Sequence, residues 1–302
     1  MQAVAALLRG RSVVCLTGAG MSTDSGIPDY RGPGSPPRKP MTFDEFCSGQ
    51  AAQRRYWSRA FVGWQHMAGA APNDGHRALA RMQAAGVIGT LVTQNVDGLH
   101  GAAGSRPLID LHGRISEVIC LECRDVTPRQ HVQTRLQALN PAYARSDTSG
   151  VEIAPDGDAL VDDSERFALA GCGTCGGRLK PHVVFFGENV PKDRVAAVTA
   201  LVDEADALLV VGSSLTVMSG FRFVRQAHRS GTPVVIVNRG ATRGDDLADV
   251  RVDAGCSETM TALAEELVSR RPAASATSHW GRPRPATGGG RDQPLRAAAT
   301  SH

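Results

Sequence analysis

Short apolar runs rich in Val, Ile and Leu recur along the chain, and none of them alternates with polar residues. Four of these runs are SVVCLTG at 12–18, VIGTLVTQ at 87–94, ALLVVGS at 207–213 and PVVIVN at 233–238. Runs of this length that are apolar on both faces are typical of strands buried inside a parallel sheet. We therefore predict that these four segments are strands of one buried sheet.

Helical patterns separate several of the runs, at 76–86, 194–206 and 259–270, and the first residues of the chain also favour a helix. Strands that alternate with helices predict an α/β fold with a doubly wound, Rossmann-like parallel sheet. We assign this larger domain to residues 1–38, 75–115 and 180–270. No apolar run approaches the ~20 residues of a membrane span, so no membrane association is expected.

Two insertions interrupt the predicted sheet. Residues 39–74 contain an aromatic, helix-like stretch, RRYWSRAFVGW at 54–64, and residues 116–179 contain few large apolar groups around a polar middle. Together they predict a smaller domain, made of a helical insertion at 39–74 and a zinc-binding module at 116–179. A bound metal would help to stabilise the second insertion, which has few apolar residues for a core. After the last helix, residues 271–302 are rich in Pro, Gly, Ala and Arg, which predicts a disordered tail.

The charge balance argues against a nucleic-acid-binding protein. The 302 residues carry 33 basic and 30 acidic side chains, a net charge of +3. A nucleic-acid binder normally has a strongly basic face. The first residues, MQAVAALLRGRSVVC, have no basic segment before their apolar part, so we interpret them as the start of the fold and not as a signal peptide. These features favour a cytoplasmic protein.

Four of the seven cysteines form two Cys-x-x-Cys pairs. In a reducing compartment such pairs indicate a metal site before a disulfide. Four thiolates complete a tetrahedral zinc site and leave no open position for water, so we expect one structural zinc ion. The predicted ligands are Cys120, Cys123, Cys172 and Cys175. The spacing between the pairs is longer than in a compact zinc ribbon, which weakens the bare motif.

A glycine-rich turn, GAGMST at 18–23, follows the first predicted strand. Glycines at such a turn let a phosphate approach the backbone N–H groups closely. Gly18 and Gly20 match the first two positions of G-x-G-x-x-G, but Thr23 stands at the third, and a plain tight turn remains the alternative. The stretch SGIPDYRGPGSPP that follows is too rich in Gly and Pro for a regular element. It predicts a loop that covers a bound cofactor.

Several blocks in a fixed order resemble the sirtuins, the NAD-dependent protein deacylases. They are GAGMSTDSGIPDYRG at 18–32, TQNVDGLH at 93–100, LHG at 111–113, VVFFGE at 183–188 and GSSL at 212–215. The resemblance covers residues 1–270. Finer features are similar to the class II branch, which includes a mitochondrial member with lipoamidase and ADP-ribosyltransferase activities. They include LNPAY, APDGD, LKPHVVFFGENV, and Tyr30 in place of a phenylalanine.

The resemblance implies an enzyme that cleaves the nicotinamide–ribose bond of NAD and moves the acyl group of a modified lysine to ADP-ribose. It implies that His112 is the general base, with Asn95 and Asp97 as further catalytic residues. His112 also follows the apolar run LIDL, at a strand end, where α/β sheets bind their ligands. A neutral imidazole suits the role, because its ordinary pKa lies near the operating pH. A structural histidine and two turn-forming side chains are the alternatives.

The resemblance also implies which residues line the NAD site. Asp97 is expected to contact the carboxamide together with Ile27, Gln94 the ribose, and Tyr30 to shield the reacting carbon from water. Arg31 is expected to help hold the covering loop and the phosphates. The expected cofactor residues are Gly18, Ala19, Gly20, Ser22, Thr23, Ile27, Pro28, Asp29, Tyr30, Arg31, Gln94, Asn95, Val96, Asp97, Gly212, Ser213, Ser214, Asn238, Arg239, Gly240 and Cys256.

The segment VVFFGE resembles the edge to which a substrate peptide adds as a strand, although an ordinary buried strand would have a similar composition. It comprises Val183, Val184, Phe185, Phe186, Gly187 and Glu188. The expected partners are acyl-lysine proteins or peptides, and the chain is expected to be a monomer. Tyr56 and Arg59 match a pair that holds acidic acyl groups in some sirtuins, but one helical turn too early. We therefore expect the match to be accidental, and Trp57, Phe61 and Trp64 to belong to the helical insertion that borders the acyl pocket.

Three other activities stay open from the sequence. A protein mono-ADP-ribosyltransferase would use the same cofactor site with a different acceptor. A non-enzymatic module that binds NAD and zinc is less favoured, because His112, Asn95 and Asp97 are all present. A hydride-transferring dehydrogenase is the least favoured. No acidic residue follows a second strand about 20 positions after the glycine turn.

Overall fold

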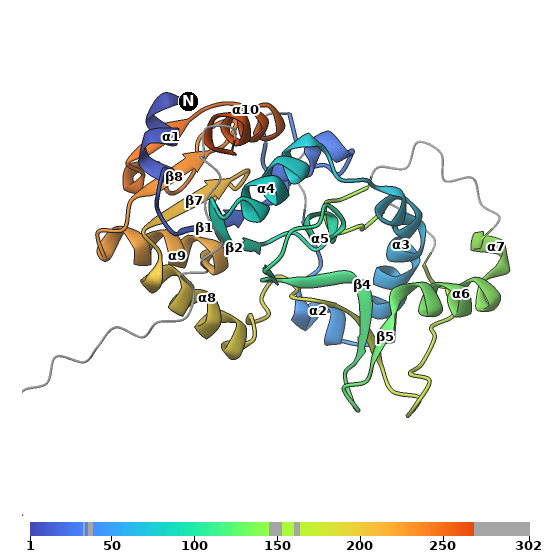
Figure 1. Cartoon of the computed structure of the whole chain (residues 1–302). Coiled ribbons are helices and arrows are strands. Elements are labelled where there is room, and N and C mark those ends of the chain that lie inside the picture. Colours follow the sequence, from blue (N-terminus) through green and yellow to red (C-terminus); the bar gives the residue numbers. More distant parts are fainter. Residues whose placement is uncertain (33, 36–38, 145–152, 160–163, 269–302) are drawn as a thin grey trace, which may run out of the picture. The chain divides into compact units, whose positions relative to one another are not determined.

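The computed structural model describes residues 1–32, 34–35, 39–144, 153–159 and 164–268, and all structural statements below concern these residues. Residues 1–270 form one compact unit (Figure 1). The tail predicted at 271–302 lies outside the described residues, as does most of the polar middle of the second insertion.

A six-stranded parallel sheet forms the larger part of the fold, in the order β3-β2-β1-β7-β8-β9. Its strands are β1 (Val13–Thr17), β2 (Ile88–Thr93), β3 (Leu108–Asp110), β7 (Ala207–Val211), β8 (Val234–Val237) and β9 (Val250–Val252). The four apolar runs in the sequence are the four inner strands, and nearly all their residues are buried. The prediction of a Rossmann-like parallel sheet is confirmed.

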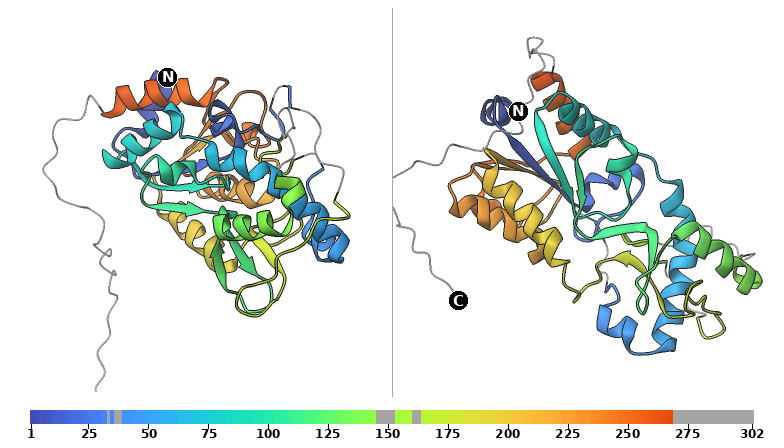
Figure 2. Two further views of the ribbon diagram at one scale, coloured as in Figure 1. Left: turned by 90° about the vertical axis from the view of Figure 1, so that its right-hand side faces the viewer. Right: turned by 60° about the horizontal axis from the view of Figure 1, so that its bottom comes forward.

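Helices cover both faces of this sheet (Figure 1, Figure 2). Successive side chains of β1 point to opposite faces of the sheet. Val13 and Cys15 belong to the hydrophobic core on one face, and Val14 and Leu16 belong to the core on the other. The first core includes residues of α1 (Gln2–Leu8), α4 (Asp74–Ala84) and α10 (Cys256–Val268). The second includes residues of α8 (Lys192–Glu204) and α9 (Met218–Arg229). This two-sided burial explains why the strand sequences are apolar throughout.

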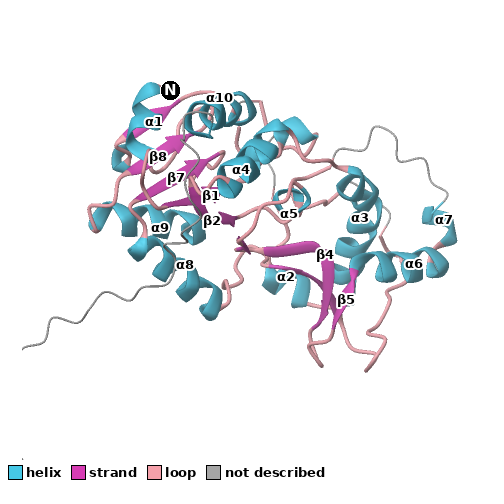
Figure 3. Cartoon of the chain, viewed as in Figure 1, coloured by secondary structure: helices cyan, strands magenta, loops and turns pink. Residues whose placement is uncertain are grey.

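A smaller module carries its own three-stranded antiparallel sheet, in the order β5-β4-β6 (Figure 3). The strands are β4 (Gly113–Cys120), β5 (Val126–Pro128) and β6 (Leu179–Val183). The helices of this part are α2 (Phe43–Cys47), α3 (Gln50–Gly69), α6 (Arg129–Leu139) and α7 (Pro141–Ala144). A third core, rich in aromatic side chains, holds the module together. The residue boundaries of the two domains stay a prediction.

Between β1 and α2, leaving aside residues 33 and 36–38, the structure describes two short 3₁₀ helices, η1 (Ala19–Met21) and η2 (Thr23–Ser25). Gly26 ends the second of them with φ of 82°, in the left-handed region that favours glycine. The remaining short elements are α5 (Leu99–Ala102), which follows β2, and η3 (Asp245–Leu247), which precedes β9. The irregular loop expected from SGIPDYRGPGSPP, residues 25–37, begins where the second of these helices ends; residues 33, 36 and 37 of it lie outside the described residues.

Within the described ranges, no helix combines the length and the apolar character needed to cross a membrane.

Candidate active site

A cavity of about 1030 Å³ lies at the carboxyl ends of the parallel strands and extends along the small module. Its walls come from the loops after β1, β2, β7 and β8, from the segment after β6, and from a short hairpin of the small module. Every cofactor, catalytic and substrate residue predicted from the sequence lines this one cavity. Sequence positions from 18 to 256 are thus brought together where α/β folds bind ligands.

The glycines after β1 and β7 lie backbone against backbone. Gly20 N–H donates to Gly212 O at 2.9 Å, and a Cβ atom on Gly18 would lie 2.8 Å from the same oxygen. Gly212 has φ of 64°, and a Cβ atom there would lie 2.5 Å from Met21 N. Only glycine fits at these places, and the missing side chains leave the backbone open to the cavity. This cradle suits the pyrophosphate of a dinucleotide.

His112 lies between β3 and β4 with both ring nitrogens in hydrogen bonds. Nδ1 lies 2.9 Å from Gln94 O, and Nε2 lies 2.8 Å from Ser219 Oγ. A carbonyl oxygen only accepts, so Nδ1 carries the proton, and Nε2 accepts from the Ser219 hydroxyl. Burial, helped by the charge of Arg194, lowers the pKa of His112 to about 4, although the bond to Gln94 acts in the opposite direction. The imidazole is therefore neutral at pH 7, with a lone pair on Nε2.

Asn95 and Asp97 share one hydrogen-bonded cluster with Ser22. The Ser22 hydroxyl donates to Asp97 Oδ2 at 2.7 Å and lies 3.0 Å from Asn95 Nδ2, which donates to it. Leu99 N–H donates to the other carboxylate oxygen at 2.8 Å. Burial raises the pKa of Asp97, and the bonds from Leu99 and Ser22 counteract that rise. The cluster fixes an amide and a carboxylate at the end of β2.

Gln94 connects three strands at the base of the cavity. Its side-chain Nε2 donates to Ser213 Oγ at 2.9 Å and to Thr17 O at 3.3 Å, while its main-chain carbonyl oxygen accepts from His112 Nδ1. The Gln94 side chain thus links the ends of β1 and β7, and the main-chain carbonyl of the same residue holds the imidazole of His112. A shift of any of these strands would displace His112.

The loop at 29–35 is shaped by Asp29, whose carboxylate accepts from Arg31 N–H and Gly32 N–H and from the Ser35 hydroxyl. The adjacent Tyr30 ring packs edge-on against Phe186, with 5.8 Å between centroids. Its phenol is hydrogen-bonded to Asp156, and burial and this carboxylate together raise its pKa well above 10. The loop is therefore tied to the small module across the cavity.

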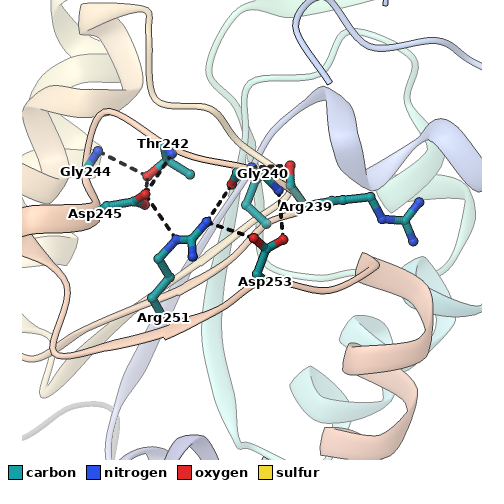
Figure 4. Close-up of polar contacts among 8 residues, drawn as sticks. Arg239, Gly240, Thr242, Gly244, Asp245, Arg251 and Asp253 are labelled. Carbon is teal, nitrogen blue, oxygen red and sulfur yellow. Dashed lines mark hydrogen bonds and ion pairs between the residues drawn. The ribbon is translucent and has the colours of Figure 1, made fainter. Parts of the chain in front are cut away.

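Beyond Asn238, at the end of β8, the backbone turns around a network of charges (Figure 4). Arg251 binds Asp245 at 3.1 Å and Asp253 at 3.2 Å and donates to Gly240 O at 3.0 Å. Asp253 accepts in turn from Gly240 N–H at 2.9 Å. The Arg239 side chain points away from this network and lines the cavity (Figure 4). The network fixes the turn that carries Asn238, Arg239 and Gly240.

The predicted substrate segment continues from β6 beside His112. Val184 N–H donates to His112 O at 2.8 Å, and Phe43 N–H donates to Phe186 O at 2.9 Å. Glu188 accepts from Phe185 N–H and pairs with the buried Lys180, each at 2.9 Å. The segment lines the cavity, is fixed through its backbone to His112, and ends in a turn in which Glu188 N–H donates to Phe185 O at 3.0 Å.

The four predicted zinc ligands lie together at the far end of the small module. The Sγ atoms of Cys120 and Cys175 are 3.6 Å apart, those of Cys123 and Cys172 are 3.7 Å apart, and all four lie within 4.8 Å of one another. Four thiolates around one zinc ion, with Zn–S of about 2.3 Å, are separated by about 3.8 Å. The side chains therefore fit a tetrahedral zinc ion, and the donor set leaves no site for a reactant.

The helical insertion at 39–74 lines the cavity through Met41 and through Tyr56 of α3. Trp57, Phe61 and Trp64 belong to this insertion, as expected, and pack within the small module. Trp57 donates to Leu179 O, Phe61 packs on Phe167, and the Trp64 indole donates to Gln130. The pattern could not predict which helix position faces the cavity, because all these side chains are apolar enough for either place.

The sequence reasoning also missed Ser219 and the carboxylates of Asp156 and Asp158, all of which line the cavity. Ser219 lies in the first turn of α9 and belongs to no motif in the sequence. Its contact with His112 depends on how α9 lies against the end of β3. The segment APDGD at 154–158 indicated only a resemblance to the class II branch. Its two acidic residues could have suggested a polar site, but nothing in the sequence placed them near Tyr30.

Comparison with known proteins agrees with this geometry. The model of the Sir2 family matches residues 18–219. NAD-dependent protein deacetylase 1 of Mycobacterium avium is 56% identical over 87% of this chain and 94% of its own length. NAD-dependent protein deacetylase 1 of Streptomyces coelicolor is 48% identical over 87% and 89%.

Among solved structures, Sir2 with a p53 peptide and NAD⁺ is similar with a TM-score of 0.70 and 33% identity, over 88% of this chain and 98% of that one. The family match spans well over half of the chain, and the first of these relatives covers 87% of it. The chain belongs to the Sir2 family, the sirtuins.

Proposed function

We propose that the chain is an NAD-dependent protein lysine deacylase of the deacetylase type, which releases nicotinamide and transfers the acyl group to ADP-ribose. The observation that carries this proposal is a neutral His112, with its Nε2 lone pair in the same cavity as the glycine cradle for a dinucleotide. The high identity to deacetylases supports the same chemistry.

In this proposal the residues of the cavity have separate roles in binding, proton transfer and exclusion of water. NAD, when bound, supplies an electrophilic ribose carbon once nicotinamide departs. His112 accepts a ribose hydroxyl proton at Nε2, since Nδ1 is already protonated against Gln94 O. Asn95 and Asp97 orient the nicotinamide side. Tyr30, held against Phe186, excludes water from the reacting centre. The four cysteines hold a structural zinc ion.

The test is a reaction of an acetyl-lysine peptide with NAD, followed by mass spectrometry. We expect free nicotinamide, deacetylated peptide and O-acetyl-ADP-ribose in equal amounts. His112→Ala should lower kcat/KM by about 10²–10⁴-fold, the usual contribution of a general base. His131→Ala, an exposed histidine on α6, is the matched control and should leave it unchanged. Full turnover by His112→Ala would refute the assigned role.

We also propose that the chain belongs to the class II branch of the sirtuins. This assignment includes a second activity, protein mono-ADP-ribosylation. What favours this branch is that Tyr30 and the APDGD residues, both branch features, meet through the bond between Tyr30 and Asp156. Adenine-labelled NAD incubated with candidate proteins separates the activities. Label that stays on protein indicates ADP-ribosylation, and its absence alongside peptide deacetylation leaves the deacylase alone.

We also propose that the NAD-binding domain comprises residues 1–38, 75–115 and 180–270, and that the enzyme is a cytoplasmic monomer. The separate aromatic core of the small module supports the division. The balanced charge and the cysteine pairs support the compartment and the absence of nucleic acid as a partner. Light scattering on the purified chain tests the monomer, with a mass near 31.8 kDa expected.

A further inference from the structure

The nitrogen of His112 that the proposed reaction requires already has a hydrogen-bond partner in the protein. Nε2, which carries the lone pair, lies 2.8 Å from Ser219 Oγ and accepts from this hydroxyl. A neutral imidazole has a single acceptor position, so it accepts one strong hydrogen bond at a time. Ser219 therefore holds the position at which a ribose hydroxyl has to bind, and the inference drawn from it rests on the proposed function.

The position of Ser219 is set by the close packing of α9 against Gln94. Ser219 lies in the first turn of α9, and the next residue, Gly220, is buried. A Cβ atom on Gly220 would lie 2.3 Å from Gln94 Oε1, so the helix backbone lies directly against the glutamine. The main-chain oxygen of Gln94 accepts from His112 Nδ1 at 2.9 Å. Gln94 and the helix that contacts it thus hold the two nitrogens of one imidazole.

The main chain around His112 is also fixed. Val184 N–H donates to His112 O at 2.8 Å, and Arg194 donates to Leu111 O at 3.1 Å. With its backbone and Nδ1 held, the ring cannot turn away from Ser219 without losing the bond to Gln94. The Ser219 hydroxyl can leave Nε2 by rotation about one single bond, from one staggered rotamer to another. The serine, and not the imidazole, is therefore the side chain that moves.

From this arrangement we propose that Ser219 is a positioning residue, which holds the His112 ring in place and is replaced at Nε2 by a ribose hydroxyl when the dinucleotide binds. The exchange breaks the hydrogen bond from Ser219 and forms one from the ribose, and no proton changes its atom in this step. Because the bond from Ser219 has to break, it lowers the affinity for ligands that carry this ribose. The net effect of one hydrogen bond corresponds to about two- to tenfold in affinity.

The test is calorimetric binding of ADP-ribose and of ADP to the full chain. Both ligands carry adenosine and two phosphates, and only ADP-ribose carries the second ribose, whose hydroxyl groups can reach Nε2. The measured quantity is the ratio of the two affinities. In Ser219→Ala this ratio should shift towards ADP-ribose by about two- to tenfold, because no protein hydroxyl has to leave Nε2.

Three variants make this comparison specific. Ser219→Thr keeps the hydroxyl and should keep the wild-type ratio. Ser230→Ala, an exposed serine at the C-terminal cap of the same helix, is the matched control and should also keep it. In a His112→Ala background, Ser219→Ala should cause no further shift, because the acceptor is absent, and this double-mutant cycle isolates the contact. A merely structural serine would weaken both ligands alike.

A measurement on the wild type needs no variant. The ¹⁵N signal of His112 Nε2 should change when ADP-ribose is added and stay in place with ADP. An unchanged signal with bound ADP-ribose would overturn the proposal. So would an unchanged ratio in Ser219→Ala, a shift towards ADP, or the same shift in the His112→Ala background. If ADP-ribose did not bind at all, both the exchange and the proposed cofactor site would be refuted.

None of these measurements depends on turnover. A wild type that bound ADP-ribose with the expected exchange but did not deacetylate a peptide would refute the proposed deacylase alone. Normal deacetylation together with an unchanged ratio in Ser219→Ala would refute only the role of Ser219.

Discussion

At the scale of single residues, the protonation of His112 follows from two neighbours. Gln94 O accepts only, which places the proton on Nδ1, and the Ser219 hydroxyl then donates to Nε2. A ribose hydroxyl that approaches Nε2 has to replace Ser219 there. The imidazole is therefore held in the form that a base requires before any ligand binds.

The first prediction concerns the titration of His112. Burial disfavours the charged imidazole, so its NMR signal in the ligand-free protein should titrate with a pKa of about 4, well below the ordinary 6.5. The signal is identified by its loss in His112→Asn. A midpoint at or above 6.5 would show that the ring is far better solvated than the structure indicates.

At the scale of elements, two contacts act beside the aromatic core of the small module: the four-cysteine cluster, and the packing of the hairpin at 153–159 on α3. The first joins the β4–β5 turn to the chain before β6, where little apolar surface is available. The second is a backbone contact that tolerates no side chain at Gly63. Both replace the packing that a longer apolar sequence would have provided.

We predict that the purified protein contains about one zinc ion per chain, measured by atomic emission. Cys123→Ser should lose the metal and lower the thermal midpoint by at least about 5 °C, because metal binding at such a site is coupled to folding. Cys47→Ser, a single cysteine outside the cluster, should keep the metal. Retention of zinc by Cys123→Ser would exclude this residue as a ligand.

Gly63→Ala should destabilise the fold by about 1–3 kcal/mol in urea unfolding, as overpacking usually does, since the new methyl group would meet Gly157 O. Gly69→Ala on the same helix is the matched control. A Cβ atom there meets nothing within 4 Å, so it should be neutral or stabilise by about 0.5–1 kcal/mol. Equal effects of the two changes would show that the hairpin yields easily.

At the scale of the whole molecule, the cavity lies where the order of the sheet reverses, between β1 and β7. Directly behind this point lie two buried histidines, His76 and His100, exposed by 0% and 1%, with 4.6 Å between ring centroids. Burial lowers the pKa of His76 to about 4 and that of His100 well below 6.5. These two imidazoles, like that of His112, therefore have to stay neutral in the folded chain.

This pair predicts a loss of global stability in mild acid. The unfolded chain binds protons on both histidines as the pH falls below 6.5, while the folded chain does not, so their contribution is complete above 6.5 and declines towards pH 4. Each adds up to about 1.4 kcal/mol per pH unit. Urea unfolding between pH 7 and 4.5 measures the slope.

His76→Gln is the informative variant for that slope. Glutamine keeps a capping group at this position of α4, where His76 and Asn73 form a capping box, and it does not titrate. The slope should become shallower in this variant. An identical slope would mean that His76 does not contribute to the acid sensitivity and that other groups determine it.

Much of the fold and the site was predictable because strong local signals coincided with it. The inner strands are apolar on both faces, and the glycine turn and LHG stand directly at strand ends. Other parts depend on long-range packing. The edge strand β9 is only Val250–Val252, too short for a pattern. The contact between Ser219 and His112 and the approach of Asp156 to Tyr30 join segments more than 100 residues apart.

The bond from Val184 N–H to His112 O joins neighbouring walls of the cavity through main-chain atoms alone. A peptide that lies along the segment from Val183 to Glu188 through its own backbone would be aligned with the imidazole whatever its side chains are. Such an enzyme would recognise the modified lysine and the main chain of an extended peptide, and the neighbouring side chains of that peptide would contribute little. One catalytic centre can then serve many different proteins, and choice among them passes to whatever exposes a modified lysine on an unfolded segment.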